Sequence, residues 1–290
     1  MNFYYNTFLD NVVYNKGPLI SIFEFPVLTI VGATFKNINN TYPCSLIEGF
    51  NNGFYTIYST SFSGFTSFTE GSILYVEALK IGRTLISGLS IVNCSTAVSF
   101  FTFTSSKPNN INYLTMVNVK GRIFRVTQKS TLILNYMSIN NNSCLNLNLF
   151  QQGCVFYVDT LSSIDIYQAN FSNVKNADTP GAFYIENSNS TISFLNFTNI
   201  TSETGYGCAY AVGANFKIHN STLKNFKNGC LQLEKSYLLL ENNSFINNGI
   251  NNYEKIYGSI ISCVYCLQMS IIGCRFEGNQ MNSLDGGVFF

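Results

Sequence analysis

The only histidine of the chain, His219, is the first residue to consider for chemistry, because an imidazole changes its charge near neutral pH. Lys217 lies two residues before it, and Glu241 occupies the equivalent position of the next sequence repeat. Strands stacked about 4.8 Å apart would bring His219 and Glu241 into contact, as an acid/base pair requires. Exposed ion pairs of this kind are common and individually weak. We therefore favour a surface ion pair and keep the acid/base pair as the alternative.

The carboxylates are too scattered to indicate a further catalytic pair. Enzymes that cleave polysaccharides use clustered carboxylates, either as an acid and a base or as calcium ligands. The chain has only five aspartates, and no two of them are adjacent: Asp10, Asp159, Asp165, Asp178 and Asp285. The sequence therefore predicts no catalytic site, and a polysaccharide lyase or glycoside hydrolase is the less favoured alternative.

The nine cysteines are many for a protein of a reducing compartment. Because the number is odd, at least one of them has no partner within the chain. Cys263 and Cys266 have the spacing of half a zinc site, but no second pair with this spacing exists. A structural zinc site needs four converging ligands. We predict neither a metal nor any other cofactor.

The composition limits the class of protein. Sixteen basic and 15 acidic residues in 290 leave a net charge of +1, which argues against a nucleic-acid-binding protein that works through a basic face. No apolar run approaches the roughly 18 residues of a membrane-spanning helix. Asparagine is unusually frequent, with 39 residues beside 26 Phe and 18 Tyr. Helix formers are scarce and apolar residues alternate with polar ones, so the sequence predicts strands.

A triplet of an apolar residue, a polar residue and asparagine recurs through the whole chain, as in Phe171-Ser-Asn173 and Phe197-Thr-Asn199. Its third residue, which we call the ladder position, returns about every 27 residues. The ladder positions are Asp10, Asn37, Gly64, Asn93, Asn118, Asn141, Asn173, Asn199, Asn225, Asn247 and Gly278. Repeats of this size cannot bury a core alone and must stack on their neighbours, so the series predicts a solenoid.

Equivalent residues of the repeats share a chemical character. The residues two and seven before the ladder position are all apolar, and those three before it are never apolar. Adjacent side chains of a strand point to opposite faces, so the apolar positions point inward. The predicted core stack contains Phe8, Phe35, Phe62, Phe171, Phe197, Phe245 and Phe276. Five before the ladder position, Gly32, Gly88, Gly273, Asn220 and Asn242 indicate a bend, because these residue types tolerate left-handed backbone.

Each repeat also contains a glycine, a small residue and an alternating strand, as at Gly207-Cys208 and Gly229-Cys230. With the triplet, this pattern resembles the repeats of the pectin-lyase-like superfamily, including large surface and autotransported proteins. The resemblance covers residues 1–290 and implies an all-β, right-handed parallel β-helix solenoid of about eleven coils of ~27 residues, with three short strands per coil, in one domain. The composition also resembles that of proteins from AT-rich protists such as ciliates.

In that superfamily, asparagines at a bend commonly form a ladder of side-chain amides that are hydrogen-bonded from coil to coil. The resemblance implies such a ladder here. Its members would be Asn37, Asn93, Asn118, Asn141, Asn173, Asn199, Asn225 and Asn247.

Two kinds of covalent modification are expected from the repeat. Cys208 and Cys230 hold the same position of adjacent repeats, with Cα atoms predicted about 4.8 Å apart, which suits a disulfide. A stack of unbonded small side chains is the alternative. Asn-x-Ser/Thr sequons occur about as often as chance predicts, so only their positions are informative. Those in loops, at bends or pointing outward are the expected glycosylation sites: Asn39, Asn170, Asn189, Asn196, Asn220 and Asn242.

These features favour a structural extracellular or cell-surface protein, a segment or subunit of a fibre, coat or adhesin. The alternative is a carbohydrate-binding or carbohydrate-active protein. The first ten residues lack the features of a secretion signal, so we expect a processed protein or a piece of a longer chain. Open terminal coils expose unpaired strand edges. We therefore expect either continuation into a longer chain or head-to-tail self-association, with the coil at Gly286–Phe290 stacked on the coil at Met1–Phe8 of the next molecule.

Overall fold

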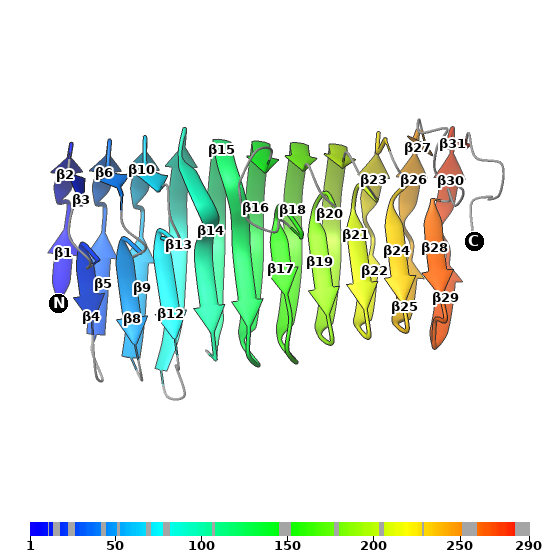
Figure 1. Cartoon of the computed structure of the whole chain (residues 1–290), viewed down its shortest axis with the longest axis horizontal. Coiled ribbons are helices and arrows are strands. Elements are labelled where there is room, and N and C mark those ends of the chain that lie inside the picture. The colour runs from blue at the N-terminus through cyan, green and yellow to red at the C-terminus, as the bar shows by residue number, and fades with distance from the viewer. Residues whose placement is uncertain are drawn as a thin grey trace.

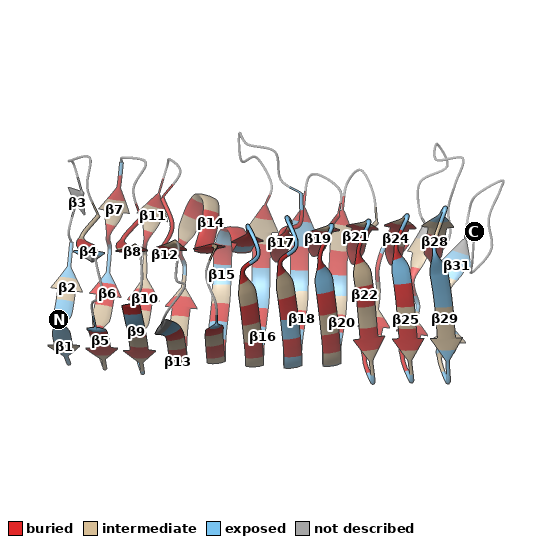
Figure 2. Cartoon of the chain, turned by 90° about the horizontal axis from the view of Figure 1, so that it is seen from below, coloured by how far each residue is buried: buried red, intermediate tan, exposed pale blue. Residues whose placement is uncertain are grey.

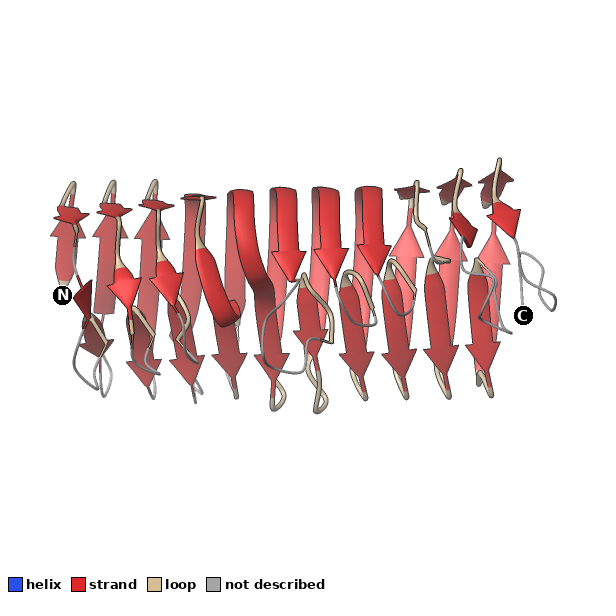
Figure 3. Cartoon of the chain, turned by 45° about the horizontal axis from the view of Figure 1, so that its top comes forward, coloured by secondary structure: helices blue, strands red, loops and turns tan. Residues whose placement is uncertain are grey.

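Successive repeats of the chain lie side by side along one long axis, from the N-terminal strands to the C-terminal strands (Figure 1). This computed structural model describes residues 1–10, 12–13, 18–22, 27–41, 45–50, 53–67, 71–77, 82–105, 108–144, 152–176, 180–202, 206–227, 229–250 and 260–281. Within these ranges all regular structure is β-strand, and no helix is present (Figure 3). Every strand pairing is parallel and joins one repeat to the next. The all-β parallel solenoid is therefore confirmed.

The strands form three main faces. The first face contains β1 (Asn2–Tyr4), β5 (Val27–Val31), β9 (Gly53–Tyr58), β13 (Gly82–Val92), β15 (Asn109–Thr127), β16 (Thr131–Cys144), β18 (Ser163–Asn176), β20 (Asn189–Ser202), β22 (Asn215–His219), β25 (Tyr237–Glu241) and β29 (Gln268–Ile272). The second face, which ends at the ladder position, contains β2 (Thr7–Leu9), β6 (Thr34–Lys36), β10 (Ser61–Ser63), the second parts of β13, β15, β16, β18 and β20, and then β23 (Thr222–Lys224), β26 (Ser244–Ile246) and β30 (Arg275–Glu277). The third face contains β4 (Ile20–Ile22), β8 (Ile47–Phe50), β12 (Leu74–Glu77), β14 (Ser95–Thr104), the end of β15, β17 (Phe156–Val158), β19 (Phe183–Glu186), β21 (Ala209–Val212), β24 (Leu231–Glu234) and β28 (Ile261–Val264).

Two features refine the prediction of three short strands per coil. A short additional segment follows the ladder position and pairs between coils as β3 (Val12–Val13), β7 (Asn39–Asn40), β11 (Thr66–Ser67), β27 (Gly249–Ile250) and β31 (Gln280–Met281). In the middle of the solenoid, strands such as β15, β16 and β18 continue through the bends, because both sides of a bend keep their pairing with the neighbouring coil.

The bends are made by single residues in left-handed backbone. The five predicted bend residues all have positive φ: Gly32, Gly88, Gly273, Asn220 and Asn242. Every ladder position does so too, from Asp10 at φ 51° to Gly278 at φ 59°. This conformation is disfavoured for most L-residues, which explains the enrichment of asparagine and glycine at these positions.

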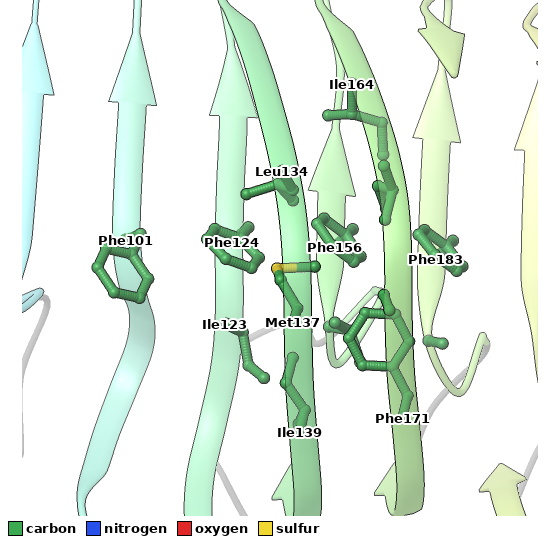
Figure 4. Close-up of a cluster of buried hydrophobic side chains, with 14 of the residues drawn as sticks. Phe101, Ile123, Phe124, Leu134, Met137, Ile139, Phe156, Ile164, Phe171 and Phe183 are labelled. Atoms are coloured by element: carbon green, nitrogen blue, oxygen red, sulfur yellow. The ribbon is translucent and has the colours of Figure 1, made fainter. Parts of the chain in front are cut away.

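The core fills the interior between the three faces, and buried and exposed side chains alternate along the strands (Figure 2). Phe8, Phe35 and Phe62 stack with ring centroids 4.6 Å apart, and Phe245 and Phe276 stack at 4.8 Å. Further along, Phe171 and Phe197 pack at 4.9 Å. A second stack on the third face, which the repeat analysis missed, runs Phe101, Phe124, Phe156 and Phe183 (Figure 4). In-register stacking brings equal side chains together, so one apolar column yields a continuous core.

Candidate functional site

The His219–Glu241 pair forms as expected from the repeat. β22 and β25 pair in register, with His219 opposite Glu241, and Nδ1 of His219 lies 3.1 Å from Oε2 of Glu241. The side chains are 20% and 45% exposed, respectively. Among the described residues, no group of three or more His, Cys, Asp or Glu side chains converges as a metal site would require. The pair has the geometry of a surface ion pair that links two coils.

The predicted disulfide between Cys208 and Cys230 is not present. Cys208 and Cys230 are buried free thiols, although the backbone of Cys208 donates a hydrogen bond to the carbonyl of Cys230 at 3.0 Å. Side chains at equivalent positions of parallel strands run side by side, whereas a disulfide needs its Cβ atoms to converge to about 3.8 Å. Burial raises the pKa of both thiols. The small-residue stack, the alternative considered for this column, is what the structure shows.

Disulfides form instead between cysteines that do not share a repeat position. Cys144 pairs with Cys154, with Cα atoms 5.7 Å apart, and Cys263 pairs with Cys266 across a short turn. The second bond joins the two cysteines whose spacing resembles half of a zinc site. Disulfides of this kind persist in oxidising compartments.

The asparagine ladder lies on an outer corner of the solenoid and runs in segments. The Asn37 amide donates to Asp10, Asn118 donates to Asn93 at 3.2 Å, and Asn141 donates to Asn118 at 2.7 Å. A second run joins Asn225 to Asn199 at 3.0 Å and Asn199 to Asn173 at 3.1 Å. Between the runs, Asn173 bonds to Asn140, one residue away from the ladder position. Gly64 interrupts the first run because glycine has no side-chain amide, and a Cβ added at this position would lie 2.7 Å from Oδ1 of Asn37.

A second set of asparagines, inside the solenoid, was not predicted. Asn243 donates to the carbonyl of Ile218 at 2.8 Å and accepts from the backbone of Ser221 at 2.9 Å. Asn248 makes the same two contacts with Leu223 and Phe226. These amides satisfy backbone groups at the bend of the preceding coil, where the strand ladder is interrupted. Their signal in the sequence is a polar residue at a position that most repeats fill with an apolar one, as Leu195 and Ile200 do.

A groove of about 550 Å³ runs along the ladder corner. Its walls carry ladder amides from Asn173 to Asn247 and the side chains of Lys175 and Lys227, and no carboxylate lines it. Neither lysine makes an ion pair with another described residue. The groove therefore presents hydrogen-bonding amides and positive charge to a ligand that extends along several coils.

The third face carries a series of tyrosine–carboxylate contacts that the sequence analysis missed. The hydroxyl groups of Tyr75 and Tyr184 donate to Glu77 at 2.8 Å and to Glu186 at 3.0 Å. Tyr210 reaches Glu234 on the next coil at 3.3 Å. The signal was a tyrosine followed two residues later by an acid. Because the carboxylates accept hydrogen bonds from the tyrosine hydroxyl groups, these contacts stabilise the side chains on the third face.

The same contacts shift the tyrosine pKa values. Burial, followed by the hydrogen bond to a nearby carboxylate, raises the pKa of Tyr75 and Tyr157 to about 12 and raises that of Tyr184 as well. The guanidinium of Arg122 lies 4.9 Å from the ring centroid of Tyr157, and its burial lowers the pKa of Arg122 to about 10. The phenols are therefore neutral donors throughout the physiological range.

The predicted glycosylation sites differ little in accessibility. Asn170, Asn189, Asn196, Asn220 and Asn242 are exposed, and Asn39 is half-buried. Exposure is necessary for a glycan and does not establish one, so these sites stay predictions. The structure also contains, among the described residues, no helix that is long and apolar enough to cross a membrane.

Comparison with known proteins identified no relative, so any assignment of function is based on the fold. No protein-family model matches the chain, and no curated protein matches its sequence significantly.

Proposed function

We propose that this chain is a non-catalytic structural segment of an extracellular fibre, surface coat or adhesin. The observation that carries the proposal is the in-register parallel pairing of successive coils along the described length, with runs of stacked phenylalanines and of bonded ladder amides. Such a rod gains stability from each added coil, because every coil covers the apolar edge of the one before it. The two disulfides fit an oxidising environment.

We further propose that the chain is a distant, right-handed member of the pectin-lyase-like superfamily, and that it comes from an AT-rich protist. The stacked triplet, the bends at single residues in left-handed backbone and the parallel pairing support the first of these assignments. Only composition supports the second.

The ends of the described solenoid suggest how such a rod extends. Strands β1 and β2 pair only with β5 and β6, and β29 and β30 pair only with β25 and β26 within the described residues. Phe8 and Phe276, at the two ends of the phenylalanine column, are only partly buried. We propose that another coil covers these edges, either from a continuing chain or from a second copy stacked head to tail. The residues Gly286–Phe290, predicted to make this contact, lie outside the described residues.

Electron microscopy of the purified chain tests this assembly. We expect rods longer than one chain, or filaments, at micromolar concentration. Met269→Lys places a charge among the inward side chains of the terminal strand β29 and should shorten the rods, whereas Ser270→Lys, whose side chain faces outward on the same strand, should not. A uniform monomer with ordered, uncovered terminal coils contradicts head-to-tail assembly.

Secretion from a eukaryotic host tests the extracellular assignment separately. Mass spectrometry of the secreted chain should find glycans on exposed sequons such as Asn170 and Asn220, and none on Asn199, whose side-chain amide donates to Asn173 within the ladder. A chain retained inside the cell without any glycan contradicts the extracellular assignment.

The groove favours carbohydrate binding as the second candidate function. Amides and lysines that line a groove across several coils suit the hydroxyl and carboxylate groups of an extended sugar polymer. Hydrogen bonds to charged groups contribute about 1.5–3 kcal/mol. Removing the side chains of Lys175 and Lys227 should therefore weaken the binding of a uronic-acid oligosaccharide by about tenfold or more. Lys235→Ala, which removes a lysine paired with Glu234 outside the groove, is the matched control. Equal binding by all three proteins refutes the groove as the binding site.

A further inference from the structure

Two exposed tyrosines are stacked against each other at the first bend of adjacent coils. Tyr113 and Tyr136 both lie five residues before a ladder position, with φ of 55° and 58°. Their ring centroids are 4.9 Å apart and the rings are within 6° of parallel. The residues are nevertheless 58% and 45% exposed. Exposure of this size is unusual for a stacked aromatic pair, because burial is the main gain from aromatic packing.

The backbone holds the two rings in place. Strands β15 and β16 pair in register on both sides of the bend, with Asn112 opposite Asn135 and Leu114 opposite Met137. The Asn135 side chain also donates to that of Asn112 at 2.8 Å, directly beside the tyrosines. The register therefore fixes the backbone positions from which the two phenol side chains extend, and their rings stack in solvent.

We propose that Tyr113 and Tyr136 are a site of oxidative cross-linking, where a peroxidase-type oxidant with hydrogen peroxide joins the two rings as dityrosine. Each phenol gives up one electron and its hydroxyl proton, and the two phenoxyl radicals combine through a new bond between ring carbons ortho to the oxygens. Those two carbons then lose their hydrogens as protons, and the hydroxyl groups are restored. Hydrogen peroxide takes up the two electrons and is reduced to two molecules of water.

The other tyrosines of the described chain lack either exposure to the oxidant or a stacked tyrosine partner. Tyr157 and Tyr184 stack at 5.3 Å, but Tyr184 is 7% exposed and its hydroxyl is bonded to Glu186. Tyr265 is 79% exposed but has no ring contact with another described tyrosine. Tyr167 contacts Tyr136 edge to face at 6.2 Å, an arrangement in which the ring carbons are less well placed to join.

The cross-link would tie two coils covalently at the outer surface, and it does not depend on the proposed fibre, because both tyrosines belong to one chain. Coupling within the chain also differs kinetically from coupling between chains. Groups held together behave as if at millimolar concentration or above, so at micromolar protein coupling within the chain should be favoured by about 10²-fold or more.

The test is oxidation of the purified 290-residue chain by a peroxidase and hydrogen peroxide, with the protein at two different concentrations in the micromolar range. We expect dityrosine fluorescence in a product that remains a monomer on a denaturing gel, with a yield independent of concentration. Trypsin does not cut before Pro108, so residues 84–120 form one peptide with Tyr113 as its only tyrosine, linked to the peptide 130–175. The mass of the linked pair should be lower by two hydrogens.

Variants that keep the stacked ring decide the site. Tyr113→Phe and Tyr136→Phe retain the aromatic packing and remove the phenol, so each should lower the monomeric dityrosine yield by about tenfold or more. Tyr265→Phe removes a more exposed tyrosine and should leave that yield unchanged. Fluorescence confined to covalent dimers, or a monomer yield that persists in Tyr113→Phe, overturns the proposal.

Discussion

Removal of one buried ring, Phe197→Ala, tests the inward assignment of the phenylalanine column. Phe197 on β20 is completely buried and its ring contacts Phe171 at 4.9 Å, Phe183 at 5.4 Å and Phe226 at 6.2 Å. It thus connects the second face with the third and with the bend after the ladder.

The expected loss follows from these contacts. Burial of one phenylalanine contributes about 1.5–3 kcal/mol, and aromatic pairs add about 0.5–1.5 kcal/mol each. With a cavity that collapses only partly, the free energy of unfolding should fall by about 3–5 kcal/mol.

Urea denaturation followed by circular dichroism measures this loss. Hydrogen exchange over residues 171–226 supplements it, because a solenoid can open locally before it unfolds globally. Phe54→Ala is the control, since Phe54 is 47% exposed, and its cost should stay within about 0.5 kcal/mol. If Phe197→Ala costs less than about 1 kcal/mol, or no more than the control, the inward assignment is wrong.

Three further predictions concern the ladder, the tyrosines and a disulfide. Asn199→Gly keeps the left-handed backbone (φ 57°) but removes two side-chain hydrogen bonds, so it should lower the free energy of unfolding by about 1–2 kcal/mol. Asn199→Ala should lower it by about 1–2 kcal/mol more in urea denaturation, because alanine adds backbone strain at this φ. Equal losses for the two variants would contradict the role of φ. The raised pKa values of Tyr75 and Tyr157, about 12 against an ordinary 10.0, predict stability that is complete below pH 10 and lost as the pH rises towards 12; a stability curve that is flat over this range, measured by thermal unfolding, would contradict it. Loss of the Cys144–Cys154 bond in Cys144→Ser should lower the free energy of unfolding by up to about 2–3 kcal/mol, because the bond closes a loop of sequence separation 10; an unchanged urea midpoint would show that it is not structural.

The resemblance of the repeats to a known β-helix fold and the periodicity of the sequence agree on the architecture. The columns of Phe35 and Phe62, and the bend residues such as Gly32 and Asn220, were identified from spacing alone. This succeeded because parallel in-register stacking places equivalent residues of each repeat in contact. A periodic sequence then specifies its own neighbours.

The contacts away from the repeating columns depended on the tertiary structure. Cys144 and Cys154 hold different positions of the repeat and pair with Cα atoms 5.7 Å apart, whereas Cys208 and Cys230 share a column and remain free. The ladder also breaks at Asn173, because its amide donates to Asn140 of the preceding coil, one residue out of column.

Periodicity was sufficient to predict the features that repeat, which are the strand order, the inward phenylalanines and the positions of the bends. Diagonal and exposed contacts became visible in the folded chain, such as the parallel stack of Tyr113 on Tyr136 and the edge contact of Tyr136 with Tyr167, one residue out of column. The physical reason is that strand pairing fixes backbone register, while side-chain rotamers and turns decide which groups meet across it.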